Sequence, residues 1–123
     1  MILSKETILF YPGKLTHLKR YQSYFPRWTL VTIHQSPKVI ICHSLGIESA
    51  ILNHPGIPII ALDPSKLNLI HDAPIYAWVQ DKRQDLITTY KTIYYSEPTH
   101  YPYMVKRIRD QIDRKLCDLL SKN

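Results

Sequence analysis

A serine stands where a buried strand pattern passes directly into a helical pattern. Residues 39–42 are all apolar, and a helical stretch over 45–52 follows them, with Ser44 at the junction. Gly46 lies two positions after this serine and Cys42 two positions before it. Small residues at these two places permit a sharp strand-to-helix turn, which exposes a serine hydroxyl as a nucleophile. The plainer interpretation is that Ser44 only caps the following helix, as serines often do.

A histidine follows later in the chain, just before a long helical pattern. The tripeptide His100-Tyr101-Pro102 precedes the amphipathic stretch 103–120. A histidine within hydrogen-bond reach of a serine hydroxyl can take its proton as a general base. The alternative is an ordinary surface histidine in a proline-rich loop.

A third feature is the turn at residues 10–14, Phe-Tyr-Pro-Gly-Lys, which ends the first apolar run. The chain has only three glycines, and two of them, Gly13 and Gly46, follow apolar runs closely. Both are expected at places where the backbone must turn without a β-carbon. This placement supports the interpretation of the serine and histidine motifs as parts of one site.

Together, these motifs resemble those of the α/β-hydrolase superfamily over nearly the whole chain, residues 7–120. The resemblance implies that Ser44 is the nucleophile and that His100 is its general base. It also implies that the backbone amides of Leu45 and Lys14 form the oxyanion hole. The helix after the serine would direct its N-terminus at the same developing negative charge.

The family's chain order places the triad acid after the nucleophile and before His100. Asp81 has the best position, because it follows the strand expected over 75–79. Asp63, at the end of an earlier strand, and Asp85, one helical turn beyond Asp81, remain alternatives. The acid is therefore left open among three aspartates, and a chain without a working acid is also considered.

Two departures from the family pattern are visible in the sequence. Cys42 stands where the serine turn usually has glycine, and Pro12 stands where the first turn usually has histidine. The family also carries two further strands at the N-terminus, and commonly a cap domain inserted between its sixth and seventh strands. Here only eleven residues separate Asp63 from Ile75, too few for a cap domain. We therefore expect a minimal, cap-less serine hydrolase core with a shallow site, whose apolar surroundings a second subunit could cover.

The activity implied is hydrolysis of a carboxylic ester or thioester through an acyl-enzyme, with no metal and no organic cofactor. No Cys/His spacing resembles a zinc site. The alternative function is a catalytically inactive protein of the same fold that binds or scaffolds partners, because fold does not fix function. The remaining histidines are expected to be structural or surface residues: His17, His34, His43, His54 and His71.

The elements that must position these residues alternate along the chain. Strands are expected at 7–11, 28–33, 39–42, 57–62, 75–79 and 92–95, and helices at 15–24, 45–52, 85–90 and 103–120. Apolar strands between helices predict a three-layer α/β/α fold with a mostly parallel sheet of five or six strands, a truncated α/β-hydrolase fold. Only residues 34–38 separate the second strand from the third, too few for a helical crossover. Either that strand is short and the chain crosses the sheet in extended form, or the strand is antiparallel or absent.

The length of 123 residues predicts a single domain, 1–123. The net charge is +6, but the closest cluster of basic residues, within 106–115, is interleaved with Asp110 and Asp113. We interpret it as the solvated face of a helix and expect no nucleic-acid partner. No apolar run approaches the roughly 20 residues of a membrane helix. The first residues lack a signal-peptide pattern, so a cytoplasmic protein with reduced Cys42 and Cys117 is expected.

Overall fold

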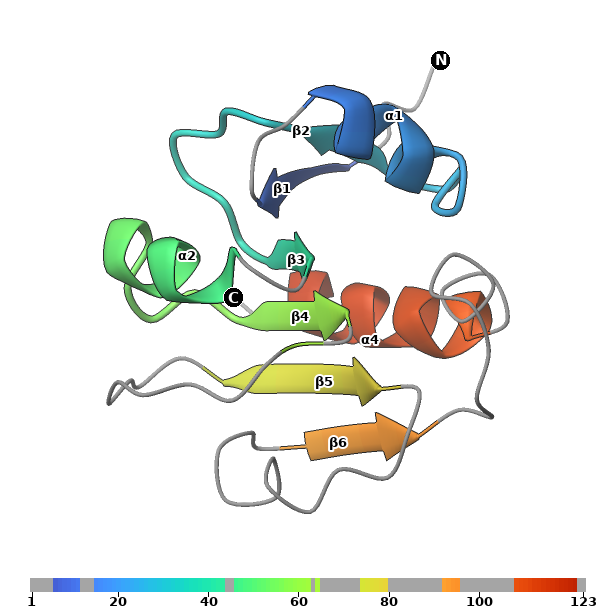
Figure 1. The fold of residues 1–123 in the computed structure, drawn as a ribbon. Helices are drawn as coiled ribbons and strands as arrows, with labels where there is room; N and C mark the ends of the chain where they lie inside the picture. Colours follow the sequence, from blue (N-terminus) through green and yellow to red (C-terminus); the bar gives the residue numbers. More distant parts are fainter. Residues whose placement is uncertain are drawn as a thin grey trace.

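The protein is built on one parallel β-sheet (Figure 1). The computed structural model describes residues 6–11, 15–43, 46–62, 64, 74–79, 92–95 and 108–121. The strands are β1 (Thr7–Tyr11), β2 (Thr29–Val31), β3 (Ile40–His43), β4 (Ile59–Leu62), β5 (Ile75–Val79) and β6 (Thr92–Tyr95). Their order is β2-β1-β3-β4-β5-β6, and all five neighbouring pairs are parallel. The predicted α/β class, with a sheet of five or six strands, is confirmed.

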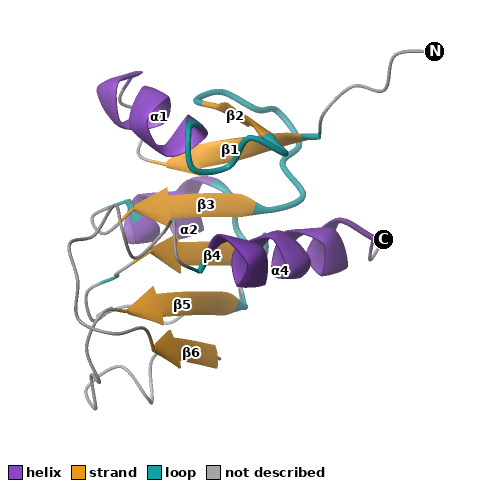
Figure 2. Cartoon of the chain, turned by 90° about the vertical axis from the view of Figure 1, so that its right-hand side faces the viewer, coloured by secondary structure: helices purple, strands orange, loops and turns teal. Residues whose placement is uncertain are grey.

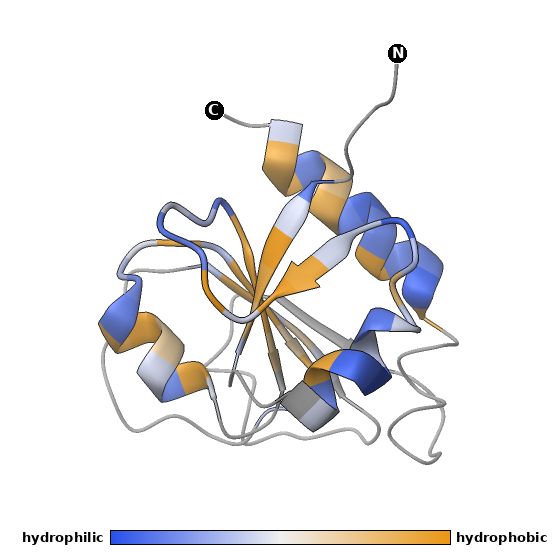
Figure 3. Ribbon diagram, turned by 90° about the horizontal axis from the view of Figure 1, so that it is seen from above, coloured by the Kyte–Doolittle hydropathy of each residue, from blue (hydrophilic) through white to orange (hydrophobic). Residues whose placement is uncertain are grey.

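Helices cover both faces of this sheet, which gives three layers (Figures 2 and 3). The helices α1 (Leu15–Gln22) and α4 (Arg109–Ser121) lie on one face, and α2 (Ile47–Asn53) lies on the other. Their bounds are close to those expected, although α1 ends earlier and α2 begins later. The helix expected over 85–90 and the start of the helix expected from 103 lie outside the described residues.

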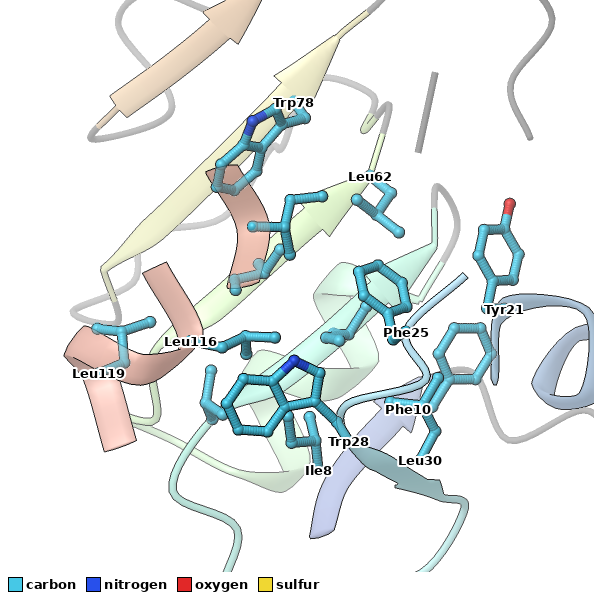
Figure 4. Close-up of a cluster of buried hydrophobic side chains, with 14 of the residues drawn as sticks. Ile8, Phe10, Tyr21, Phe25, Trp28, Leu30, Leu62, Trp78, Leu116 and Leu119 are labelled. Carbon is cyan, nitrogen blue, oxygen red and sulfur yellow. The ribbon is translucent and has the colours of Figure 1, made fainter. Parts of the chain in front are cut away.

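Alternate residues of β1, β3, β4 and β5 contribute to two hydrophobic clusters, one on each face of the sheet. The larger cluster lies under α1 and α4, and most of its aromatic residues lie near β1 and β2 (Figure 4). Its largest members are Phe10, Tyr21, Phe25, Trp28 and Trp78. In α4 the buried residues Ile112, Leu116 and Leu119 recur at helical spacing and pack onto this cluster.

The second cluster lies under α2 and uses the other residues of the same strands. Several of its members have small side chains: Cys42, Ala50, Ala61 and Ala77. Because β3, β4 and β5 contribute to both clusters, their side chains are buried on both faces. This explains the near-continuous apolar runs in the sequence.

The connection from β2 to β3 settles the alternatives left open above. β2 has only three residues and pairs with β1 in parallel, from Thr7↔Thr29 to Leu9↔Val31. β3 pairs with the opposite edge of β1, so residues 32–39 cross from one side of β1 to the other without a helix. The second strand is therefore short and parallel, and the first alternative is confirmed.

The two cysteines are free and belong to opposite faces of the sheet. Cys42 is buried in the cluster under α2, whereas Cys117 is half-buried against the cluster under α4. The sheet between them keeps the two thiols apart. Among the described residues, no helix combines the length and the apolar character needed to cross a membrane.

Candidate active site

The candidate catalytic residues themselves lie outside the described residues. This holds for the nucleophile, the general base, both oxyanion donors and the three acids: Ser44, His100, Leu45, Lys14, Asp63, Asp81 and Asp85. The structure does describe the strands and the helix that flank most of them in the chain. Those elements define the surroundings in which the chemistry would take place.

The most informative feature is the place where β1 and β3 lie side by side. The chain leaves β1 through α1 on one face of the sheet and leaves β3 through α2 on the other face. From β1 the next strand is added on one side, and from β3 the next strand is added on the opposite side. Such a reversal is the topological switch point, where open parallel sheets bind ligands beyond the carboxyl ends of their strands.

The register fixes which chain segments leave the sheet at this point. Tyr11, the last residue of β1, pairs with Cys42, and β3 ends one residue later at His43. Residues 12–14 therefore follow β1, and Ser44 follows β3, at the carboxyl edges of two adjacent strands. The two halves of the expected site are attached to neighbouring strands.

The start of α2 bears on the plainer interpretation of Ser44. The N-cap of α2 is Gly46, whose carbonyl accepts a hydrogen bond of 2.9 Å from the Ala50 amide. Gly46 itself makes no side-chain hydrogen bond at this end of the helix. Ser44 precedes this N-cap by two positions in the chain, so Ser44 is not itself the N-cap residue of α2.

The glycines differ from the expectation in one respect. Gly46 has φ −92° and ψ −3°, which any residue can adopt. Gly56, in the turn between α2 and β4, has φ +81°, the conformation that favours glycine. The backbone conformation therefore favours glycine at position 56 and not at position 46. At position 46 the residue is buried, which favours a small residue there. Gly13 lies outside the described residues.

Cys42, two positions before the serine, is a small residue in a buried environment. Its side chain is fully buried between the sheet and α2. Burial raises the pKa of the Cys42 thiol far above its ordinary range, because a thiolate would lose its hydration there. The thiol is therefore neutral and packs as a small apolar group.

A polar contact beside the switch point joins residues that the sequence patterns did not connect. The Asn53 side-chain amide, at the end of α2, donates a hydrogen bond to the Tyr11 hydroxyl. The Tyr11 ring also meets the His54 ring edge-on, with centroids 6.3 Å apart. The contact ties β1 to α2, the two elements that flank residues 12–14 and Ser44. In the sequence, the only sign of this contact is that the expected strand ends in Tyr11 and the expected helix is followed by Asn53, both with polar side-chain groups.

A separate pocket lies at the opposite, amino-terminal edge of the sheet. It has a volume of about 230 Å³, and its lining residues are Glu6, Thr7, His34, Ser36, Lys38 and Leu120. His34 Nδ1 accepts a hydrogen bond of 3.2 Å from the Ser36 amide. The neutral ring then carries its proton on Nε2, which lies 3.1 Å from the Thr7 hydroxyl. His34 thus lies in the β2–β3 connection and contacts both Thr7 and Ser36 there.

In the part of the chain that the structure describes, no group of three or more His, Cys, Asp or Glu residues gathers to hold a metal ion. Comparison of the chain with protein-family models, with curated proteins and with solved structures found no match.

Proposed function

We propose that this protein is a serine hydrolase that cleaves a carboxylic ester or thioester through Ser44. One observation carries the proposal: Ser44 directly follows β3 at the switch point between β1 and β3. A serine between a buried parallel strand and a helix matches the position of a nucleophile in a cap-less α/β-hydrolase core. Gly46 occupies the N-cap position of α2, so that position does not account for a serine at residue 44.

The proposed reaction proceeds in two stages. The Ser44 oxygen attacks the carbonyl carbon, and His100 takes the hydroxyl proton. The bond to the leaving alcohol or thiol then breaks, and His100 returns the proton to the leaving group. Water, activated by the same histidine, hydrolyses the acyl-enzyme and restores the serine. The Leu45 and Lys14 amides would stabilise the oxyanion in both stages.

The acid that orients His100 is proposed to be Asp81, with Asp63 and Asp85 as alternatives. The proposed substrate is a small or surface-presented ester, because a cap-less core leaves the carboxyl edge of the sheet open. The free thiols of Cys42 and Cys117 fit the reducing cytoplasm, which we propose as the compartment.

A fluorophosphonate probe tests the nucleophile directly. The wild-type protein should be labelled and should hydrolyse a short-chain aryl ester, and both properties should vanish in Ser44→Ala. Ser49→Ala is the matched control, because Ser49 is an exposed serine on α2 and should leave labelling unchanged. Absence of labelling in folded wild-type protein would contradict the proposal and favour the inactive scaffold, the second candidate.

The acid is tested by three parallel substitutions, Asp81→Asn, Asp63→Asn and Asp85→Asn. Loss of the acid disturbs the tautomer and orientation of the histidine and lowers kcat by several orders of magnitude, about 10⁴-fold in the best-studied triad. We expect this loss in Asp81→Asn alone, with the other two variants close to wild type. A large loss at Asp63 or Asp85 instead would reassign the acid and leave Ser44 and His100 in their roles.

A further inference from the structure

The strand β2 forms one edge of the sheet, so some of its backbone groups face away from the other strands. The Thr29 amide donates a hydrogen bond of 3.0 Å to the Glu6 carbonyl, on the β1 side. Backbone groups alternate in direction along a strand, so the residues on either side of Thr29 turn theirs away from β1. The Trp28 carbonyl and the Leu30 amide therefore point toward the open edge.

A single side chain forms hydrogen bonds with both of these backbone groups. The Gln22 carboxamide accepts a hydrogen bond of 2.8 Å from the Leu30 amide through Oε1. Through Nε2 it donates one of 2.8 Å to the Trp28 carbonyl and one of 3.1 Å to the Phe25 carbonyl. One residue of an additional parallel strand would pair with the same two groups of Trp28 and Leu30. Gln22 thus takes the place of a neighbouring strand.

The segment that Gln22 covers has a sequence suited to self-pairing. Residues 28–33 read Trp-Thr-Leu-Val-Thr-Ile, with no charge, proline or glycine. Short segments of high β-propensity and no charge stack on identical segments when their edges are open. Ile33, just beyond β2, is 85% exposed, and among the described residues only Leu52 is another exposed large hydrophobic side chain. The segment therefore offers an apolar contact as well as backbone groups.

We propose that Gln22 closes an edge at which residues 28–33 would otherwise pair with the same segment of a second copy of this chain. Two identical edges can pair as antiparallel strands about a twofold axis, so each copy supplies the same residues to the other. In the paired state, backbone groups of the second copy replace the Gln22 carboxamide at Trp28 and Leu30. The surface is independent of Ser44 and of the proposed hydrolase activity.

The test compares Gln22→Met with Gln35→Met by light scattering after size exclusion, over a wide range of protein concentration. Methionine retains the length and helix propensity of glutamine but cannot make its hydrogen bonds. Gln35 is the matched control, because it is an exposed glutamine of the β2–β3 connection. Wild type and Gln35→Met should remain monomeric, whereas Gln22→Met should shift to dimers or larger species as concentration rises.

Two measurements tie any association to this edge. Adding Ile33→Lys to Gln22→Met should restore the monomer, because lysine at a sheet edge opposes pairing. Exchange of the Leu30 amide should be slow in wild type at all concentrations. In Gln22→Met it should be fast when dilute and slow when concentrated, as the second copy replaces Gln22.

Several results would overturn the proposal. One is a Gln22→Met variant that stays monomeric at every concentration, and another is association that Ile33→Lys leaves unchanged. If Gln22→Met does not fold, Gln22→Asn provides the same comparison, because its carboxamide is one methylene shorter and cannot reach both groups. Failure of both variants to fold would make Gln22 an essential structural residue and not a guard of the edge.

Discussion

The indole nitrogen of Trp28 donates a hydrogen bond of 2.8 Å to a carboxylate oxygen of Asp113, 85 positions further along the chain. A similar contact of 3.1 Å joins the Trp78 indole to the Gln111 side chain. Trp28 precedes β2 and Trp78 lies in β5, so two indoles from well-separated strands attach to α4. The helix is therefore fixed in position by polar contacts as well as by its apolar stripe.

We expect Asp113→Ala to lower the free energy of unfolding by about 1.5–3 kcal/mol, since it leaves the buried Trp28 N–H without its charged acceptor. Asp113→Asn retains an acceptor and should lose less. Urea denaturation monitored by tryptophan fluorescence measures both changes. Asp110→Ala is the control, because this exposed residue of the first turn of α4 should cost only about 0.3–1 kcal/mol through the helix dipole. Equal losses at both positions would contradict the role of the indole contact.

Gly56→Ala should destabilise the protein although the added methyl group meets no atom. Nothing lies within 4 Å of a β-carbon built at this position, but the backbone φ of +81° is one that alanine disfavours. We expect a loss of about 1–2 kcal/mol, the cost of left-handed backbone for a residue with a β-carbon. Gly56→Asn should lose less, because asparagine tolerates this conformation better. Thermal or urea unfolding that ranks the two variants the other way would contradict this account.

The elements that local patterns define were predicted most accurately. The bounds of β1, β5 and β6 match the expected runs 7–11, 75–79 and 92–95 residue for residue. The stripe of Ile112, Leu116 and Leu119 likewise indicated the last helix. These features depend on alternation and on helical spacing, which the sequence displays directly.

The parts that tertiary contacts decide could not be predicted in the same way. The run 28–33 is rich in β-forming residues throughout, yet only Thr29–Val31 pairs with β1. Residue 32 already begins the passage around β1 toward β3, and the Trp28 indole reaches α4. The requirements of the chain path therefore override the local β-propensity at both ends of this run.

In the candidate site, too, local sequence patterns could be predicted and tertiary contacts could not. The serine between strand and helix could be recognised, because its motif is contiguous in the chain. The contact between Tyr11 and Asn53 joins residues 42 positions apart, and no periodic pattern connects them. Likewise, the choice of Gly46 and not Ser44 as N-cap depends on where the backbone first turns helical, which apolar spacing locates only within a few residues.

The buried thiol of Cys42 predicts a pH dependence of stability. Burial raises the pKa of this thiol, so it stays neutral in the folded state. An unfolded cysteine ionises with a pKa of about 8.5. The contribution of Cys42 is therefore fully present below about pH 8.5 and is lost as the pH rises toward the pKa of the folded state.

The measurement is the free energy of unfolding of wild type and Cys42→Ala in urea, at several pH values above and below that point. The advantage of wild type should shrink at alkaline pH, with a limiting slope of about 1.4 kcal/mol per pH unit. A constant difference between the two proteins would show that Cys42 ionises as readily in the folded state as in the unfolded state.

The hydrogen bond between Tyr11 and Asn53 should contribute a measurable coupling between β1 and α2. Tyr11→Phe and Asn53→Ala each remove one partner, and the double variant removes both. We expect a coupling free energy of about 0.5–1.5 kcal/mol in the resulting double-mutant cycle. The pair Tyr11→Phe and Ser49→Ala is the control and should be additive, because Ser49 is exposed on the same helix. Additivity in the first cycle would show that the contact contributes nothing to stability.

Ser44→Ala separates a chemical role for this serine from a structural one. The N-cap of α2 is Gly46, so removal of the Ser44 hydroxyl should change the free energy of unfolding by less than about 0.5 kcal/mol. A capping serine would instead cost about 1 kcal/mol. Fluorophosphonate labelling and urea denaturation of the same preparation measure the two roles independently. Lost labelling with unchanged stability is the outcome expected of a nucleophile, whereas unchanged labelling with a loss near 1 kcal/mol would return Ser44 to the role of a helix cap.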